Sequence, residues 1–138
     1  MIDLLPQHDT TSVRTLRSYC VGNPTPDKLD AICRGYRDDP QQHLFGIEEH
    51  EQVIGCTGIR CEAPSCAVVQ CIAVLPEQRQ QHVGISLIQS VCNRFALQQL
   101  IAETDQDAVD FYRRYGFTVT SLGEVYPGTE RFLCVLQC

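Results

Sequence analysis

The sequence has no excess of basic residues and no long apolar run. It carries 11 lysines and arginines against 17 aspartates and glutamates, so its formal net charge is −6. A nucleic-acid-binding domain usually presents a basic surface, so we expect no nucleic-acid partner. No apolar stretch approaches the roughly 18 residues of a membrane helix, and no signal-peptide pattern opens the sequence. We therefore expect a cytoplasmic protein without a membrane role.

No two cysteines have the Cys-x-x-Cys spacing that is typical of zinc sites, although the chain holds nine cysteines. Four of the cysteines recur every five residues: Cys56, Cys61, Cys66 and Cys71. The sequence "EAPS" between the second and the third of them has the composition of a turn. If the chain folds back there, Cys61 faces Cys66. Cys56 then faces Cys71. Residues five apart on a strand point to opposite faces, so these thiols cannot surround one ion. We expect small apolar side chains that fill the sheet, with cross-strand disulfides or a redox role as the alternative.

The order of apolar patterns predicts one domain, residues 1–138, with a mixed sheet. Segments with strand character are 1–5, 43–48, 53–61, 66–74, 100–105, 117–122 and 131–136. Segments with helix character are 8–20, a stretch from Thr25 to about residue 37, 84–95 and 105–116. The predicted fold class is α/β (α+β): a mixed, mostly antiparallel central sheet of about seven strands, with four helices on both faces.

Residues 72–91, "IAVLPEQRQQHVGISLIQSV", have the pattern of a strand, a turn and a helix. A helix start leaves up to four backbone N–H groups without intrahelical acceptors and carries a partial positive charge. Phosphates bind there when the chain approaches closely, which glycine allows. Gly84 in the first helical turn and Arg79 before it favour an anion site, although many such turns bind nothing.

A further helix is predicted from "DQDAVDFYRRYGF", residues 105–117. Asp105 is placed to cap its start, and Arg113 and Arg114 lie in its last turn, where positive charge is favoured. Gly116 is placed for a left-handed C-terminal cap. The apolar residues of this helix fall on one face: Ala108, Phe111, Tyr112 and Tyr115.

These two segments together resemble the GNAT family of coenzyme A-dependent N-acetyltransferases. "VLPEQRQQHVGISLI" is similar to the family's pyrophosphate loop, Gln/Arg-x-x-Gly-x-Gly/Ala, with Arg79 at the first position and Gly84 at the last. "DQDAVDFYRRYGF" is similar to the pattern Asn-x-x-Ala-x-x-Phe-Tyr-x-x-x-Gly-Phe, with Asp105 in place of the asparagine. The other matched residues are Ala108, Phe111, Tyr112, Gly116 and Phe117. The resemblance extends over about the last two-thirds of the chain.

The resemblance implies an acyl-CoA N-acyltransferase-like fold in which the fourth and fifth strands splay apart. Acetyl-CoA would be the co-substrate, with its pantetheine arm in the gap. The arm would pair with the backbone near Ile72, Ala73 and Val74 as another strand would, and the loop amides would hold the pyrophosphate. The remaining coenzyme-binding residues that the resemblance implies are Arg79, Gln80, Gln81, His82, Val83, Gly84, Ile85, Asp105 and Phe111.

His82 departs from the family pattern, because it stands at the position of the middle glycine. We expect an exposed histidine that contributes only its backbone amide, although an imidazolium would add positive charge near a phosphate. The resemblance places Tyr112 where the family tyrosine often protonates the leaving thiolate. A simple core role for this aromatic ring is the alternative.

The resemblance does not assign a base for the acceptor amine. Candidates by residue type only, each expected as a solvated surface charge, are Glu48, Glu49 and Glu62. The acceptor pocket is expected to involve the first two helices and the loop between the last two strands. The residues which that loop contributes are Tyr126, Glu130 and Arg131. No metal is expected, because three of the histidines show no ligand spacing: His8, His43 and His50.

The predicted function is the transfer of an acetyl group from acetyl-CoA to a primary amine of an unidentified small molecule or protein. Direct attack in a ternary complex is favoured over an acetylated cysteine, because no cysteine adjoins a histidine in a recognisable motif. The alternatives are a non-catalytic acyl-CoA-binding sensor and a cysteine-based redox or metal protein. The protein is expected to be a monomer or homodimer.

Overall fold

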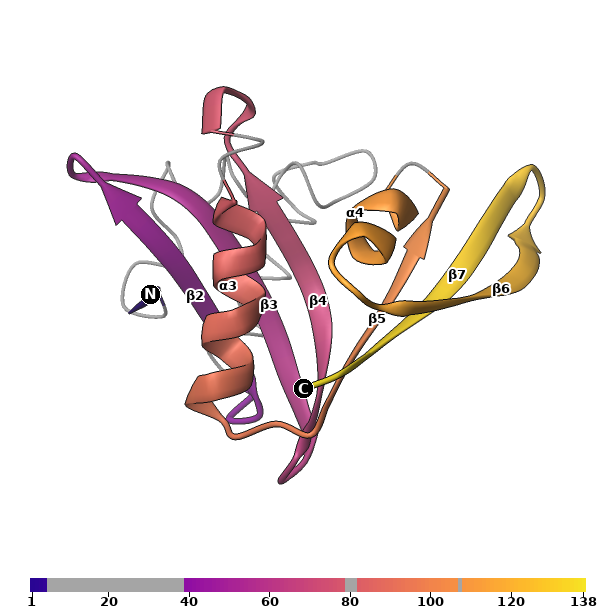
Figure 1. Cartoon of the computed structure of the whole chain (residues 1–138), viewed down its shortest axis with the longest axis horizontal. Helices are drawn as coiled ribbons and strands as arrows, with labels where there is room; N and C mark the ends of the chain where they lie inside the picture. Colours follow the sequence, from indigo (N-terminus) through magenta and orange to yellow (C-terminus); the bar gives the residue numbers. More distant parts are fainter. Residues whose placement is uncertain (5–38, 79–81, 107) are drawn as a thin grey trace.

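The structure is a computed structural model that describes residues 1–4, 39–78, 82–106 and 108–138. Its centre is a seven-stranded sheet (Figure 1). The strands are β1 (Ile2–Asp3), β2 (Gln42–Glu49), β3 (Gln52–Ala63), β4 (Cys66–Val74), β5 (Gln99–Asp105), β6 (Thr118–Tyr126) and β7 (Thr129–Gln137). Each of them overlaps a strand predicted from the sequence, so the expectation of about seven strands is confirmed.

The sheet divides into two wings. Its strand order is β1-β2-β3-β4-β5-β7-β6, and every neighbouring pair is antiparallel except β4 and β5, which are parallel. We call β1 to β4 the first wing and β5, β7 and β6 the second wing; Figure 1 shows them as the two arms of a V. The mixed, mostly antiparallel sheet predicted from the sequence is confirmed.

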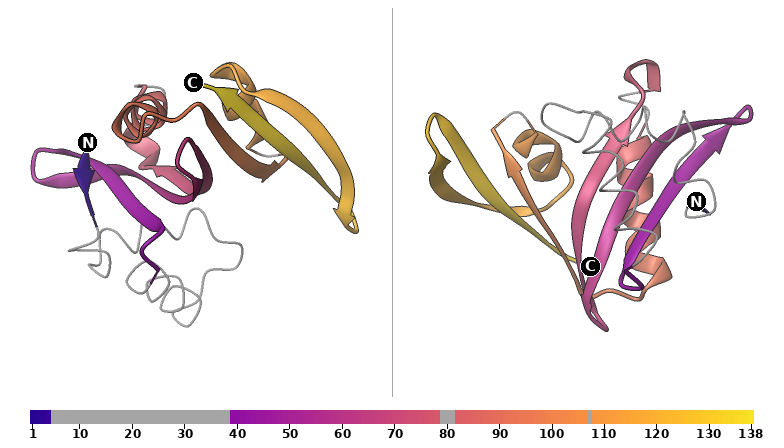
Figure 2. Two further views of the ribbon diagram at one scale, coloured as in Figure 1. Left: turned by 90° about the horizontal axis from the view of Figure 1, so that it is seen from below. Right: turned by 180° about the vertical axis from the view of Figure 1, so that it is seen from behind.

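Two α-helices, α3 (Val83–Arg94) and α4 (Val109–Arg114), lie on the same face of the sheet (Figures 1 and 2). A short 3-10 helix, η2 (Pro76–Gln78), follows β4. A parallel strand pair needs a crossover connection, and α3 supplies it between β4 and β5. The predicted helices over 8–20 and from Thr25 lie outside the described residues. Among the residues described, no helix is both long and apolar enough to cross a membrane.

The two ends of α4 differ in how well the sequence predicts them. The N-cap residue is Ala108, and no side-chain hydrogen bond caps the helix. The prediction that Asp105 caps α4 is therefore wrong: the Ala108 N–H donates to the Asp105 backbone carbonyl (3.3 Å), which places a turn before the helix. At the other end Gly116 has a φ of 93°, as predicted. The Phe117 N–H donates to the Tyr112 carbonyl (3.1 Å), the hydrogen bond of a Schellman motif.

A two-residue turn joins β2 to β3. Glu49 and Gln52 are paired across it, and both central residues, His50 (φ 53°) and Glu51 (φ 64°), adopt the left-handed conformation. Turns of this kind match the twist of the strands but favour asparagine and glycine, which tolerate positive φ. A side chain such as histidine or glutamate is strained there by about 1 kcal/mol or more.

The hairpin of β3 and β4 contains the evenly spaced cysteines. Cys61 lies opposite Ala67 and Cys56 lies opposite Ala73. The predicted facing of cysteine with cysteine across this hairpin is therefore wrong. Two register shifts within the hairpin displace the strands from the simple fold-back that the sequence suggested. None of these four cysteines forms a disulfide bond in the part of the chain that the structure describes.

The main core cluster spans both wings and the helices above them. Its buried members are Phe45, Ile59, Ala67, Val69, Ile88, Val91, Leu97, Leu100, Ala102, Val109, Tyr112, Phe117 and Cys134. The helical spacing in the sequence predicts an apolar stripe on α3 made of Ile85, Ile88, Val91, Cys92 and Phe95, and burial confirms it at Ile88 and Val91. Leu87 is fully buried although it lay outside that stripe, whereas Ile85 is only half-buried. The core therefore lies under α3 and α4, where the wings meet.

Candidate coenzyme site

The gap between the wings begins where β4 and β5 stop pairing. Residues Cys66–Val69 of β4 pair with Gln99–Ala102 of β5, and the ladder ends there. β4 nevertheless continues to Val74, and β5 continues to Asp105. The two strands therefore diverge over their C-terminal halves, as the resemblance implied.

A β-bulge in β4 coincides with the end of this ladder. On β3, Gly58 lies opposite Cys71 and Ile59 lies opposite Val69, so Gln70 is the extra residue. A bulge bends its strand and increases the local twist. The bend at Gln70 turns the rest of β4 away from β5.

Thr57 stabilises the segment that follows the bulge. Its side chain is fully buried, and its Oγ1 donates a hydrogen bond to the Cys71 carbonyl (2.9 Å). Sequence reasoning missed this residue. The sequence does contain a signal for Thr57, because its hydroxyl is the only one in the otherwise apolar stretch "VIGCTGI". A hydroxyl that is buried with such a strand needs a hydrogen-bond partner.

The part of β4 predicted to contact the coenzyme lies after the bulge. Ile72, Ala73 and Val74 pair with β3 on one side and lie beyond the last β5 partner on the other. The Ala73 side chain is buried and the other two are half-buried. The backbone of this segment therefore borders the gap.

The start of α3 lies at the same end of the molecule as the gap (Figure 1). Its N-cap residue is His82, which is exposed, has a left-handed backbone (φ 62°) and makes no capping hydrogen bond through its side chain. The first turn of α3 holds no acidic residue, so no carboxylate in that turn compensates the partial positive charge at the start of the helix. The conformation of His82 explains why the family favours glycine at this position. Arg79, Gln80 and Gln81 lie outside the described residues.

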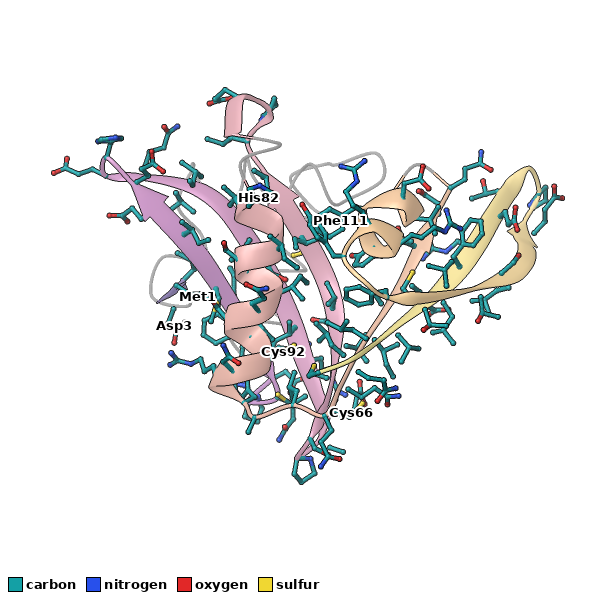
Figure 3. The ribbon with its side chains drawn as sticks, viewed as in Figure 1. Met1, Asp3, Cys66, His82, Cys92 and Phe111 are labelled. Atoms are coloured by element: carbon teal, nitrogen blue, oxygen red, sulfur yellow. The ribbon has the colours of Figure 1, made fainter. Side chains whose placement is uncertain are left out.

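Gly84 brings α3 and α4 together. A Cβ at this position would lie 2.7 Å from Cε2 and 2.9 Å from Cζ of Phe111, closer than real contacts allow. Figure 3 shows Phe111 and His82 at the same end of the molecule, on α4 and at the start of α3 respectively. Sequence reasoning predicted a glycine for phosphate approach, and the structure adds a second reason, the close packing of Phe111. Val83 is buried beside it and Ile85 is half-buried.

Tyr112, the predicted catalytic residue, is buried in the main core cluster with 5% of its surface exposed. Its ring makes edge contacts with Phe111 (centroids 5.1 Å apart) and Phe117 (5.1 Å). The ring thus packs against the predicted coenzyme residue Phe111. This placement fits both the catalytic prediction and the core alternative.

The other candidates lie at the end of β5 or on the surface. Asp105 is the half-buried last residue of β5 and lies opposite Arg131 of β7. The candidate bases Glu48, Glu49 and Glu62 are all exposed. Glu62 forms an ion pair with Arg60 (3.0 Å), and Glu130 accepts a hydrogen bond from Ser121. In the described ranges, no three His, Cys, Asp or Glu side chains gather as metal ligands do.

Residues 40–119, more than half of the chain, match the sequence model of the acetyltransferase (GNAT) domain. The chain belongs to the GNAT family. Comparison with curated proteins finds none that matches the sequence of this GNAT domain.

Solved structures share the fold of this GNAT protein. A GNAT-family protein from Desulfovibrio desulfuricans matches with a TM-score of 0.80 and 19% identity over 99% of this chain and 96% of that one. The ribosomal-protein-S18-alanine N-acetyltransferase of Escherichia coli gives 0.74 and 16% over 95% and 88%. A GNAT acetyltransferase from Elizabethkingia anophelis with acetyl-CoA bound gives 0.66 and 17% over 90% and 89%.

The family and its structures support acetyl transfer from acetyl-CoA in general, with acetyl-CoA as the co-substrate. The geometry fits such a ligand, because diverging strands and a helix start meet at one end of the sheet. At these identities the likeness to single structures concerns the fold, so it does not identify an acceptor.

Proposed function

We propose that this protein transfers an acetyl group from acetyl-CoA to a primary amine of a small molecule or protein. The reaction proceeds by direct attack in a ternary complex, and residues 1–138 act as one domain, as a monomer or homodimer. The observation that carries the proposal is the divergence of β4 from β5 at the Gln70 bulge, beside the start of α3.

The coenzyme lies along this divergence. The pantetheine amides pair with the β4 backbone at Ile72–Val74, where β5 no longer occupies the neighbouring position. The pyrophosphate rests on the amides that open α3, from Gln80 to Ile85, with Arg79 as a cation beside it. Phe111 borders the coenzyme from α4, because its ring lies against Gly84 in that first turn.

Tyr112 acts as the general acid. The neutral amine attacks the thioester carbonyl, the C–S bond breaks, and the departing thiolate takes the phenolic proton. Burial between Phe111 and Phe117 restricts the ring to one orientation. Water or an unassigned group removes the proton from the amine, because Glu48, Glu49 and Glu62 are all exposed and nothing in their surroundings marks one of them as the base.

The direct test is a panel of amines incubated with labelled acetyl-CoA. Chromatographic detection is needed, because nine protein thiols would react with reagents that detect released coenzyme A. Tyr112→Phe should lower turnover by ~10²-fold or more, while the unfolding midpoint stays near that of the parent. Tyr115→Phe is the matched control: its ring also packs on Phe111 (4.9 Å), and we expect an unchanged rate.

Three outcomes distinguish the proposed enzyme from its alternatives. An unchanged rate in Tyr112→Phe removes this residue from the mechanism but leaves the coenzyme site intact. Tight binding of acetyl-CoA without transfer to any amine favours the sensor module. Absence of coenzyme binding at millimolar concentration in calorimetry contradicts the proposal as a whole.

A further inference from the structure

Cys92 and Cys138 bring two thiols into contact across the meeting point of the two wings. Cys92 lies in the last turn of α3, and Cys138 directly follows β7. The Cys138 N–H donates to the Gln98 carbonyl (3.0 Å), which holds the backbone there in place. Figure 3 shows Cys92 on the half of α3 that lies away from the coenzyme end, toward the vertex of the V.

The two sulfur atoms are already close enough to react. Their Sγ atoms lie 2.8 Å apart, and a disulfide bond of about 2.05 Å needs a further approach of only about 0.8 Å. The side chain of Cys92 is half-buried, whereas Cys138 is exposed. Burial, together with the hydrogen bond and charge of Cys138, raises the pKa of Cys92 to about 12. Because Cys138 is the exposed thiol of the two, an external disulfide reaches it first, and Cys92 is the thiol that resolves.

A groove gives a small molecule access to this pair. It has a volume of about 710 Å³ and lies between α3 and the second wing, with both cysteines in its wall. Ile85, Ile88 and Leu136 line its apolar part. Its volume is within the range of sites that take small ligands, so a compact disulfide can reach the sulfur of Cys138.

The two cysteines lie on parts of the fold that few backbone hydrogen bonds connect. α3 packs on the first wing through Val83 and Leu87, which contact Ile54 of β3. Cys138 belongs to the second wing. The sheet joins the wings through the short ladder of β4 and β5 alone among the described strands. A bond between these sulfurs would therefore add a covalent connection between the wings.

We propose that Cys92 and Cys138 are an oxidation site that forms a reversible disulfide with a low-molecular-weight disulfide such as oxidised glutathione. The Cys138 thiolate attacks one glutathione sulfur, the S–S bond of oxidised glutathione breaks, and the departing glutathione thiolate takes up the proton that Cys138 released, leaving a mixed disulfide on Cys138. The Cys92 sulfur then attacks the Cys138 sulfur and releases the second glutathione thiol, which takes the Cys92 proton. The protein loses two hydrogen atoms and the oxidant is reduced to two thiols.

The test treats the reduced protein with oxidised glutathione, blocks the remaining thiols at low pH and maps the peptides without reduction. We expect a Cys92–Cys138 cross-link, no retained glutathione, and a Tm increase of about 5–15 °C that dithiothreitol reverses. Cys138→Ser, a change at an exposed position, should abolish both the cross-link and the shift. Cys66→Ser, a half-buried thiol elsewhere in the chain, should retain them.

Each contrary result overturns the proposal. A cross-link that joins other cysteines, or a glutathione adduct that persists on Cys138, shows that Cys92 does not resolve. A Tm increase that survives in Cys138→Ser shows that another bond produces it. None of these readouts depends on acetyl transfer.

Discussion

The contact between Gly84 and Phe111 gives a quantitative test of how α3 and α4 meet. In Gly84→Ala, the new Cβ falls 2.7 Å and 2.9 Å from two atoms of the Phe111 ring. Overpacking of this kind costs about 1–3 kcal/mol. Replacement of glycine by alanine in a helix gains up to about 1 kcal/mol. The net loss of stability is therefore about 0–3 kcal/mol, a range that includes zero, so a single variant does not isolate the clash.

A double-mutant cycle isolates the clash. In the Phe111→Ala background the ring is absent, so Gly84→Ala should show only the gain from helix propensity. The coupling energy between the two substitutions should then be about 1–3 kcal/mol. We would measure it from urea unfolding curves followed by circular dichroism, with equal slopes required for all four proteins.

Ser86→Ala provides the control for this cycle. Ser86 lies in the same helix, and its side chain is exposed. Its substitution should be additive with Phe111→Ala within about 0.5 kcal/mol. A coupling energy below about 0.5 kcal/mol between Gly84→Ala and Phe111→Ala would refute the close packing of the two helices. Close approach of the coenzyme would then be the only reason for the glycine.

Three further substitutions test other features of the site and the fold. Thr57→Val keeps the shape of the side chain but removes the hydrogen bond to Cys71, so stability should fall by about 1–2 kcal/mol and coenzyme affinity with it; Thr57→Ser should retain both. Equal stability of the valine variant would show that the bulge does not need this bond. His82→Gly should retain coenzyme binding in calorimetry and raise stability by up to about 1 kcal/mol, because glycine tolerates the left-handed backbone; complete loss of binding would show that the imidazole is required. Replacing His50 with Asn and Glu51 with Gly should raise the free energy of unfolding by about 1 kcal/mol, and an unchanged urea midpoint would contradict the strain assigned to this turn.

The seven strands and both described helices could be predicted because each has a strong local signal. Gly116 is one example: a glycine after a run of helix-forming residues needs no tertiary information to mark the end of α4. The start of α4 was predicted wrongly at Asp105, since a good capping residue also forms simple turns, and only the position of the sheet decides between them.

The candidate site was predictable in its parts but not in its construction. The segment around Gly84 showed where a helix would begin, yet its contact with Phe111 depends on how far α4 lies from α3. The bulge at Gln70 and the supporting hydroxyl of Thr57 depend on the register between strands. Register is a long-range property, and the same limit explains why the cysteine partners across β3 and β4 were predicted wrongly.

The short ladder between β4 and β5 has a consequence for how the molecule opens. Backbone hydrogen bonds hold each wing together along long antiparallel pairs, whereas few of them join one wing to the other. The wings nevertheless share one apolar cluster, in which Ile59 and Val69 pack together with Phe117 and Cys134. Cooperative unfolding must therefore be transmitted through side chains at this junction. Amide hydrogens on both sides should exchange together as long as that cluster stays intact, and should separate into two protection classes once it is truncated.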